Sequence, residues 1–539
     1  MKFKKLITVM LVSMMTVSSL ASCGNTASES SSSASGTTEK ESTSTAVESS
    51  DTASSEDKGI TFPLEEKLTF TVLCGSTSSE FPMADNIALN YTLENANIEF
   101  ELTDVLVAEL TEKRNLLIAS GDYPDVFFKS GLGNDADKYG TQGIFIPLED
   151  LMREYAPNFC RVMDETDGWQ WITAADGHVY SFPDQDELIP KAPFWINKRW
   201  LDNLGLEEPT SYDELYEVLK AFKEKDANGN GDPNDEVPFA CTVGAIPALM
   251  AYQDYIFDWD TKLAIIDGEI TYAYAHESYK EFITFAKKLY DEGLVNEDLL
   301  TVKKADLRTQ GKAADIYGMI NDHGAFQSVG EERHFDFILL TPFEEDVFVL
   351  RNPYNRGALA ITDACENPEV IVAWADQFFT EEGGIIKWLG LEGETYEVDA
   401  DGNWYWIYDK GHGEDINSVR NSATLFYGQK FPGIQPEFYN ANMAVNGGNE
   451  VDVALTKERA KIVPLSTHFP CLNLTEGENA ELAPIKTDIN GYAAEFLVKV
   501  LSGELELEEN WDEYVNMLKQ MGLDRMLAIY NTAYERNSK

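Results

Sequence analysis

From Lys67 onward, hydrophobic and polar positions follow two alternating periods, which predict strands separated by amphipathic helices. The expected order is a strand at Leu68–Cys74, a helix at Met83–Glu94, a strand at Ile98–Thr103, a helix at Val107–Ala119 and a strand at Val126–Phe128. Strands joined in this way pair in parallel through right-handed crossovers. The pattern therefore predicts an α/β unit with a parallel sheet.

A second series of elements begins near Phe194 and predicts another α/β unit. The expected strands are Phe194–Asn197, Ile316–Ile320 and Gly357–Ile361, and the expected helices are Lys198–Leu206, 210–225, Ser278–Glu292 and Pro368–Thr380. The last hundred residues are expected to be mainly helical, with amphipathic stretches at Asn490–Ser502 and Trp511–Ala533. Open α/β sheets bind ligands beyond the carboxyl ends of their strands, which points to the loops Gly75–Ser79 and Lys129–Gly131.

The first residues have the pattern of an export signal. Three lysines, Lys2, Lys4 and Lys5, precede an apolar run that ends near Leu20. The run continues into Leu-Ala-Ser-Cys23, which resembles a bacterial lipobox. We expect a signal peptide over residues 1–22 and lipidation of Cys23, which would anchor the chain to the outer face of the cell membrane. The alternative is a plain secretory signal with an incidental cysteine.

Composition narrows the class of protein further. The chain has 539 residues and a formal net charge of -51, so it repels phosphate backbones and is not expected to bind nucleic acid. Residues 23–59 are almost all small or acidic and are expected to form a flexible tether. The five remaining cysteines are scattered and form no zinc motif: Cys74, Cys160, Cys241, Cys365 and Cys471.

One loop, DANGNGDPNDEVP, carries oxygen-bearing side chains on every second residue. Alternating oxygen ligands with a glycine at the sixth position, here Gly231, are typical of calcium loops of the EF-hand kind. Position twelve is Val237 rather than the usual Glu. The expected ligands are Asp226, Asn228, Asn230, Asp232, Asp235 and Glu236. No His or nucleophile adjoins the loop, so we expect a structural Ca²⁺; the alternative is a polar turn without metal.

The segment from Trp195 to Leu215, continuing to Gly231, closely resembles the extracellular solute-binding proteins of family 1. These are carbohydrate-binding lipoproteins of ABC importers, and the similarity is to their long branch that carries a calcium loop. Further matching stretches are Ala119–Asp125, Asp176–Pro183, Gly390–Val398, Trp511–Val515, Met521–Asp524 and Ala533–Arg536. Asn234 lengthens the usual spacing before the acidic pair of the loop.

The resemblance implies a two-lobed α/β fold of the periplasmic-binding-protein type II class, with a ligand cleft between the lobes and extra C-terminal helices. By analogy the chain crosses between lobes near 184–191, 351–357 and 388–393. This gives an N-terminal lobe of residues 60–187 plus 352–390 and a C-terminal lobe of 188–351 plus 391–539. In the family the calcium loop lies away from the ligand.

A sugar presents flat C–H faces and a rim of hydroxyls, so its binder needs aromatic rings and polar side chains. The expected ligand-binding residues are Ser76, Ser78, Lys129, Ser130, Trp195, Trp259, Asn321, His323, Tyr354, Arg356, Trp404 and Trp406. Core packing is the alternative for each aromatic residue. Trp169 and Trp171 fit a cleft and a core equally well.

The resulting hypothesis is a monomeric, membrane-anchored binding protein that captures a carbohydrate by lobe closure and delivers it to the permease subunits of an ABC importer. We expect this carbohydrate to be an oligosaccharide. No covalent chemistry is expected. Two other classes stay open: an extracellular carbohydrate-active enzyme, which would cleave oligosaccharides, and a calcium-dependent carbohydrate adhesin, which would lose binding in chelator.

Overall fold

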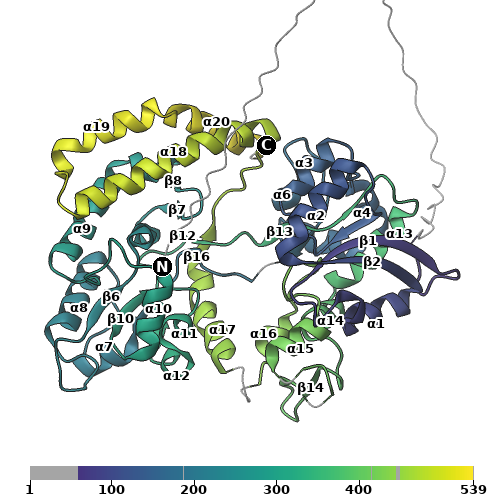
Figure 1. The fold of residues 1–539 in the computed structure, drawn as a ribbon, viewed down its shortest axis with the longest axis horizontal. Helices are drawn as coiled ribbons and strands as arrows, with labels where there is room; N and C mark the ends of the chain where they lie inside the picture. Colours follow the sequence, from purple (N-terminus) through teal and green to yellow (C-terminus); the bar gives the residue numbers. More distant parts are fainter. Residues whose placement is uncertain (1–58, 186, 409, 414, 445–449, 538–539) are drawn as a thin grey trace, which may run out of the picture. The chain divides into compact units, whose positions relative to one another are not determined.

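A five-stranded sheet in the order β2-β1-β3-β13-β4 forms the centre of the first lobe (Figure 1). In this computed structural model, which describes residues 59–185, 187–408, 410–413, 415–444 and 450–537, β1 (Leu68–Ser76) is parallel to β2 (Ile98–Leu106) and to β3 (Val126–Phe128). The predicted parallel crossovers are confirmed. Of the other two strands, β13 (Tyr354–Ile361) is antiparallel to β3, and β4 (Phe182–Gln185) is antiparallel to β13.

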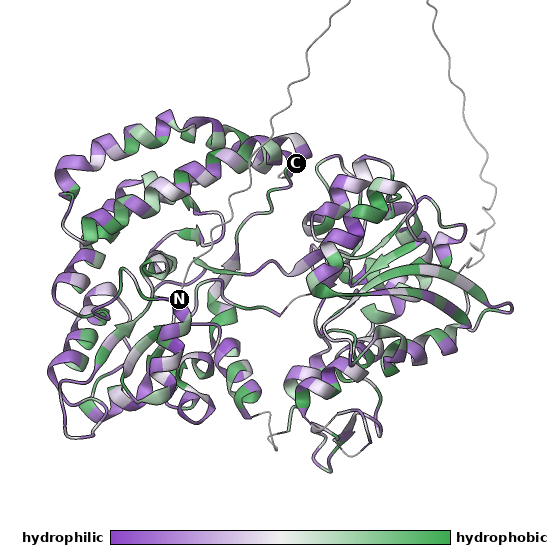
Figure 2. Cartoon of the chain, in the orientation of Figure 1, coloured by the Kyte–Doolittle hydropathy of each residue, from purple (hydrophilic) through white to green (hydrophobic). Residues whose placement is uncertain are grey.

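Helices surround the sheet of the first lobe and bury its apolar side chains. They are η1 (Met83–Asp85), α1 (Ile87–Ala96), α2 (Val107–Ser120), α3 (Asp135–Thr141), α4 (Glu149–Tyr155), α5 (Pro157–Glu165), α6 (Trp169–Ile172), α13 (Pro368–Asp376), η4 (Gln377–Phe379) and α14 (Glu381–Leu389). The side chain of Asn86 caps α1 by accepting a hydrogen bond from the backbone of Leu89, and Asn97 ends the helix in the left-handed conformation. Figure 2 shows hydrophobic residues along the strands of this sheet.

The second lobe is built on a four-stranded sheet in the order β11-β5-β10-β6. The strand β10 (Tyr317–Asn321) is parallel to β6 (Val237–Ala240) and antiparallel to β5 (Phe194–Asn197), which in turn pairs with β11 (Phe337–Leu339). The accompanying helices are η2 (Val243–Tyr252), η3 (Ala273–Ala275), α7 (Lys198–Leu204), α8 (Tyr212–Glu224), α9 (Glu277–Asp291), α10 (Lys304–Ala313), α11 (Ala325–Val329) and α12 (Glu331–His334). A smaller sheet contains β7 (Ile256–Asp258), β8 (Leu263–Ile266) and β9 (Glu269–Tyr272).

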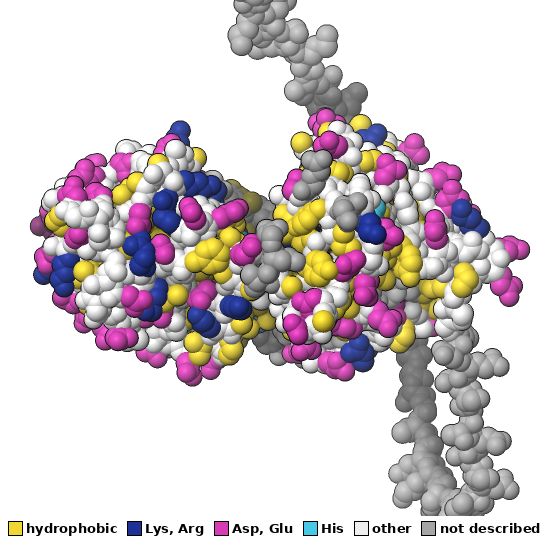
Figure 3. All heavy atoms as spheres, turned by 90° about the horizontal axis from the view of Figure 1, so that it is seen from below, with side chains coloured by type: hydrophobic (Ala, Val, Ile, Leu, Met, Phe, Trp, Pro, Cys, Tyr) yellow, Lys and Arg dark blue, Asp and Glu magenta, His cyan; other side chains and the backbone are white. Residues whose placement is uncertain are grey.

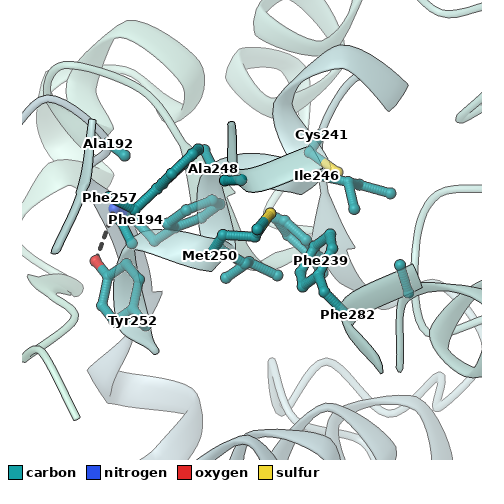
Figure 4. Close-up of a cluster of buried hydrophobic side chains, with 14 of the residues drawn as sticks. Ala192, Phe194, Phe239, Cys241, Ile246, Ala248, Met250, Tyr252, Phe257 and Phe282 are labelled. Atoms are coloured by element: carbon teal, nitrogen blue, oxygen red, sulfur yellow. Dashed lines mark hydrogen bonds between the residues drawn. The ribbon is translucent and has the colours of Figure 1, made fainter. Parts of the chain in front are cut away.

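Three C-terminal helices complete the core of the second lobe. They are α18 (Glu476–Leu501), α19 (Leu507–Gln520) and α20 (Leu523–Asn537). Their buried side chains join the same hydrophobic cluster as the sheet, part of which Figure 4 shows around Phe194, Phe239 and Tyr252. The amphipathic stretch predicted at Trp511–Ala533 is two helices rather than one, because Gly522 takes a positive φ of 107° between them.

Residues 391–444 pack on the first lobe, whereas the predicted boundaries assign them to the C-terminal lobe. Four elements in this segment, β14 (Tyr396–Val398), β15 (Trp404–Trp406), α15 (Ile416–Ala423) and α16 (Glu437–Ala441), form a cluster that packs on α14 and Ile87 of the first lobe. The boundary predicted at residue 391 therefore needs correction, as does the crossing predicted at 388–393. The chain changes lobes between α16 and α17 (Glu450–Ile462), since Leu455 and Ile462 belong to the core of the second lobe.

Several connections lie close together between the two cores. Asp184 and Lys191 flank the first, and Tyr354 begins β13 after the second. The short strand β12 (Phe348–Leu350) pairs in parallel with β16 (Ser466–His468), which follows η5 (Val463–Leu465). Among the residues that the structure describes, we find no helix with the length and hydropathy of a membrane span.

Candidate functional site

A cavity of about 870 Å³ is lined by residues from both lobes. The first lobe contributes Asp137, Trp171 and Tyr354, and the second contributes Lys191 and Asp258. The segment that leads into α18 adds Phe469, Cys471, Asn473 and Asn479 to the wall. This volume lies within the range of cavities that hold small organic ligands.

Arg356 holds one wall of this cavity in place. Its Nε donates to the carbonyl oxygen of Trp171 at 2.7 Å, and an NH2 group donates to that of Thr173 at 2.9 Å. The same nitrogen also donates to the amide oxygen of Asn473, and the other terminal nitrogen pairs with Asp137. Burial raises the pKa of Asp137, and the charge of Arg356 opposes that shift. Arg356 therefore lines the cavity while its donors are committed to protein groups, and its contact with a ligand stays a prediction.

Tyr354 and Trp171 place two aromatic rings at the same cavity. The Tyr354 hydroxyl lies 2.7 Å from Thr166 Oγ1, and its side chain is buried. The Trp171 ring packs edge-on against His468, with centroids 5.6 Å apart. Both rings are fixed before any ligand arrives, which limits the entropy cost of binding.

Lys191 connects the first cavity to a second one. Its Nζ lies 2.7 Å from Asp258 Oδ1 and 3.2 Å from Asp260 Oδ2, and all three residues line the first cavity. The second cavity, of about 260 Å³, is also lined by Lys191, together with Trp259. Residues 258–260 thus form a wall that both cavities share.

Three of the predicted ligand-binding residues meet at the second cavity: Trp259, Asn321 and His323. The Lys262 ammonium covers one face of the Trp259 ring at 3.1 Å from its centroid, and burial lowers the pKa of Lys262 to about 8. Asn321 donates its amide to the carbonyl of Pro193 at 2.8 Å. The Nε2 of His323 lies 2.9 Å from an Arg459 nitrogen, which can only donate, so this ring nitrogen accepts.

Four predicted residues near the ends of β1 and β3 do not line either cavity: Ser76, Ser78, Lys129 and Ser130. Ser76 donates to Asp104 at 2.8 Å, and the Ser78 hydroxyl accepts from the backbone of Glu80 at 3.1 Å. Lys129 is buried and donates to the carbonyls of Leu425, Tyr427 and Gln429 at 2.7, 2.7 and 3.0 Å. Burial lowers its pKa to about 7. Ser130 is also buried, and its hydroxyl has no hydrogen-bond partner in the described part of the chain.

Core packing accounts for three of the predicted tryptophans. Trp195 is buried, and its Nε1 donates to the carbonyl of Asp322 at 3.0 Å. Trp404 and Trp406 are buried in the cluster of the 391–444 segment, where Trp404 donates to the carbonyl of Tyr439 at 2.9 Å. Their positions correct the expectation that these rings face the cleft, because none of the three lines either cavity and all three are enclosed by other side chains.

Sequence reasoning missed other lining residues, notably Asp137, Lys191, Asp258, Phe469 and Asn473. Asp258 adjoins Trp259 in the motif Phe-Asp-Trp-Asp, and this aromatic flanked by carboxylates was the available signal. No local pattern marks Phe469 or Asn473, which reach the cavity only because β16 pairs with β12.

The loop at 226–236 is held by its own side chains. Asp226 accepts from the backbone of Gly231 at 2.9 Å, and Glu236 accepts from that of Ala227 at 2.8 Å. Asp235 accepts from the amides of Asn228 and Asn230 at 3.0 and 2.7 Å. The side chains of Asn230 and Asp232 cap backbone groups further along the loop.

Two carboxylate oxygens of the loop, Asp226 Oδ1 and Glu236 Oε2, are buried without a hydrogen-bond partner in the described residues. Burial raises the pKa of Glu236. Uncompensated buried oxygens of this kind fit a cation. A search of the described residues for three or more clustered His, Cys, Asp or Glu finds no such group, so a cation here would depend on amide and backbone oxygens as well.

Cys23, the predicted lipidation site, lies outside the described residues.

Known proteins are similar to this chain in sequence and in architecture. The chain is 28% identical over 527 residues to the fructooligosaccharide ABC transporter substrate-binding protein FusA of Streptococcus pneumoniae, covering 90% of this chain and 94% of that protein. It is 27% identical to lipoprotein LipO of Bacillus subtilis over 492 residues, covering 87% and 93% of the two chains. A solved solute-binding protein of Bifidobacterium longum subsp. infantis superposes with a TM-score of 0.72 at 22% identity, covering 88% of this chain and 99% of that one.

The predicted two-lobed α/β class is confirmed by these structural neighbours and by the two separate sheets. The sequence model of one family, described as bacterial extracellular solute-binding protein, matches residues 84–385. This match covers more than half of the chain and includes β2, β3, β4 and β13 of the first sheet and all four strands of the second lobe's main sheet. The chain therefore belongs to the bacterial extracellular solute-binding protein family.

Proposed function

We propose that this protein is the binding component of an ABC importer and that its cargo is a carbohydrate, an oligosaccharide rather than a single sugar. The observation that carries the proposal is the cavity of about 870 Å³ with walls from both lobes. The name of the relative FusA, a fructooligosaccharide-binding protein of an ABC transporter, supports the same class of cargo.

The lining of the cavity suits the surface of a sugar. The rings of Trp171, Tyr354 and Phe469 offer apolar faces to C–H groups. Carboxylates such as Asp135 and Asp176 accept hydrogen bonds from hydroxyls, and the amides of Asn352 and Asn479 both donate and accept. None of this requires a reaction, and the cargo would leave unchanged.

Capture by lobe closure follows from the origin of the lining. A ligand that contacts both lobes stabilises the closed arrangement by the difference between its affinities for the closed and open states. The closed form would then be the one that the permease subunits recognise. We propose that the protein acts as a monomer, because one chain supplies both walls of the cavity.

We also propose that the chain is held at the outer face of the cell membrane through lipid on Cys23. The lipobox-like sequence before this cysteine supports the anchor, and so does the name of lipoprotein LipO, a relative of nearly full length. Residues 23–59 would then act as the tether that lets the folded part reach the permease.

The loop at 226–236 would hold a structural Ca²⁺ through Asp226, Asn228, Asn230, Asp232, Asp235 and Glu236. The two unpartnered carboxylate oxygens support this assignment, and Ca²⁺ would supply only charge compensation to the loop. Names among the structural neighbours mention an EF-hand mutant of FusA and an alginate-binding protein without calcium ion.

A thermal-shift and calorimetric screen of neutral and acidic oligosaccharides tests the function. We expect a stabilising shift with one class of saccharide, a dissociation constant in the micromolar range or below, and a smaller radius of gyration by solution scattering when the ligand is bound. Cleavage of the saccharide during incubation, or indifference to every saccharide, would contradict the proposal.

A further inference from the structure

The second cavity differs from the first in its charge. Its lining includes three basic side chains, Lys191, Lys304 and Arg351, and one acidic side chain, Asp322. The first cavity has more acidic than basic side chains in its lining. This cavity is cationic although the formal net charge of the chain is -51. Figure 3 shows acidic side chains spread over one face of the molecule.

The negative charge of Asp322 is more than compensated by two cations, Arg308 and Lys304. Arg308 donates to both carboxylate oxygens, with distances of 3.0 and 2.7 Å, and Ser328 donates at 2.7 Å. Lys304 is more distant, with its Nζ 3.7 Å from Asp322 Oδ2. Because Arg308 already compensates this carboxylate, the ammonium of Lys304 is surplus. Burial lowers the pKa of Lys304, so an anion in the cavity would offset the cost of keeping this amine charged.

Arg351 is the second surplus cation. It is exposed, lines the cavity, and makes no side-chain hydrogen bond or ion pair among the described residues. Lys191, by contrast, is neutralised by Asp258 and Asp260. Arg351 is placed on the connection that precedes β13, next to Asn352, which lines the first cavity.

We propose that the second cavity binds the carboxylate of an acidic sugar residue, while the neutral part of the same saccharide occupies the first cavity. This inference rests on the proposed function and adds to it the substrate class, a saccharide that contains a uronic acid. Arg351 and Lys304 supply the charge, and a planar carboxylate can accept two hydrogen bonds from the Arg351 guanidinium.

The neighbours of the two cations fit this role. The Trp259 ring has one face covered by Lys262, so a sugar ring stacks on its other face. Asn321 and His323 line the same cavity and can bond the hydroxyls next to the carboxylate. Since residues 258–260 border both cavities, a single oligosaccharide extends from one to the other.

Isothermal titration of the mature chain in calcium buffer tests the assignment with four probes. They are a trisaccharide of two neutral sugars and one galacturonic acid, its methyl ester, the neutral trisaccharide kestose and a disaccharide that has no carboxylate but carries one sulfate ester. We expect the acid to bind at least about tenfold more tightly than its methyl ester, which has the same shape without the charge, and to weaken as salt rises.

Two substitutions and a matched control locate the effect. Arg351→Gln and Lys304→Met are each expected to weaken binding of the acid by about tenfold and to leave binding of the ester unchanged. Arg161→Gln, which removes an exposed arginine paired with Glu165 on α5, is expected to change neither. Arg351 is exposed, so its substitution reports on binding even where the Lys304 variant fails to fold.

The possible outcomes distinguish the acidic-sugar inference from the proposed function. Equal or tighter binding of the ester or kestose, or no effect of Arg351→Gln, would overturn the acidic-sugar inference and leave the proposed function standing. Tight binding of the sulfated sugar without the uronide would overturn the carboxylate assignment. Failure of every saccharide to bind would overturn the proposed function itself.

Discussion

The guanidinium of Arg356 on β13 donates a hydrogen bond to the amide oxygen of Asn473, 117 residues further along the chain. The same side chain pairs with Asp137 and bonds two carbonyls near α6. Asn473 in turn donates to the carbonyl of Gln170 at 3.1 Å. One arginine thus ties the segment that enters the C-terminal helices to the sheet of the first lobe.

Replacing Arg356 with Ala should destabilise the fold, because it leaves the mostly buried carboxylate of Asp137 without its counter-charge. We expect a loss of about 3 kcal/mol in the free energy of unfolding. Urea denaturation followed by tryptophan fluorescence measures this loss. Arg356→Lys restores the charge without the planar fork and should recover only part of it. Wild-type stability in the Ala variant would contradict the role assigned to this arginine.

Removing calcium should lower the melting temperature without abolishing saccharide binding, since the loop at 226–236 lies outside both cavities. Differential scanning calorimetry in calcium and in chelator measures the shift. In Asp226→Asn combined with Glu236→Gln, the difference between the two buffers should disappear. A melting temperature that is the same with and without chelator would exclude a structural Ca²⁺.

Trp259→Ala should weaken saccharide binding by about tenfold, because it removes the ring face that the second cavity exposes. Trp259→Phe keeps an aromatic face and should retain most of the affinity. The measurement is titration calorimetry at fixed calcium concentration. Unchanged affinity in the Ala variant would remove Trp259 from the binding site.

Trp404→Phe, unlike Trp259→Ala, should lower stability and leave saccharide affinity unchanged. Trp404 is fully buried in the 391–444 cluster and stacks on Tyr439 with ring centroids 5.1 Å apart. Its replacement should lower the melting temperature through lost packing, by about 1–3 kcal/mol in stability, and leave saccharide affinity unchanged. A selective loss of affinity would instead return this residue to the ligand site.

His334 should make stability fall in mild acid. It is buried among the rings of Trp195, Phe326 and Phe335, and burial, with the nearby charge of Arg459, lowers its pKa from 6.5 to about 4. Between pH 6.5 and about 4 the unfolded chain binds a proton at this histidine that the folded chain does not, so stability decreases as pH is lowered through that range.

His334→Phe keeps the ring and removes the titrating group. The urea midpoint of the variant should therefore change less than that of the wild type between pH 7 and pH 5. Parallel pH profiles for the two proteins would show that His334 does not contribute to this dependence.

The local elements of the first lobe could be read from the sequence because each follows one hydrophobic period. The strands β1, β2 and β3 and their parallel order emerge from alternation and crossover rules alone. The antiparallel strand β13 could not be placed in that sheet in the same way, since it pairs with β3 across more than two hundred residues of intervening chain.

The candidate site was harder to predict for a related reason. A tryptophan has the same local pattern whether it packs in a core or faces a cavity, so Trp259 and Trp404 could not be distinguished by sequence. Lys129 illustrates the other difficulty. It was predicted at a strand end as a ligand residue, yet three carbonyls of the distant 425–429 segment satisfy its amine.

The contribution of α18, α19 and α20 to the core of the second lobe has a consequence for how the chain is made. The helix α9 and the strand β9 are synthesised earlier, but they stay incompletely covered until Tyr530 has left the ribosome. For that interval the nascent lobe exposes apolar surface that holdase chaperones and proteases recognise. Premature termination within the last forty residues should therefore yield a degraded polypeptide rather than a shortened binding protein.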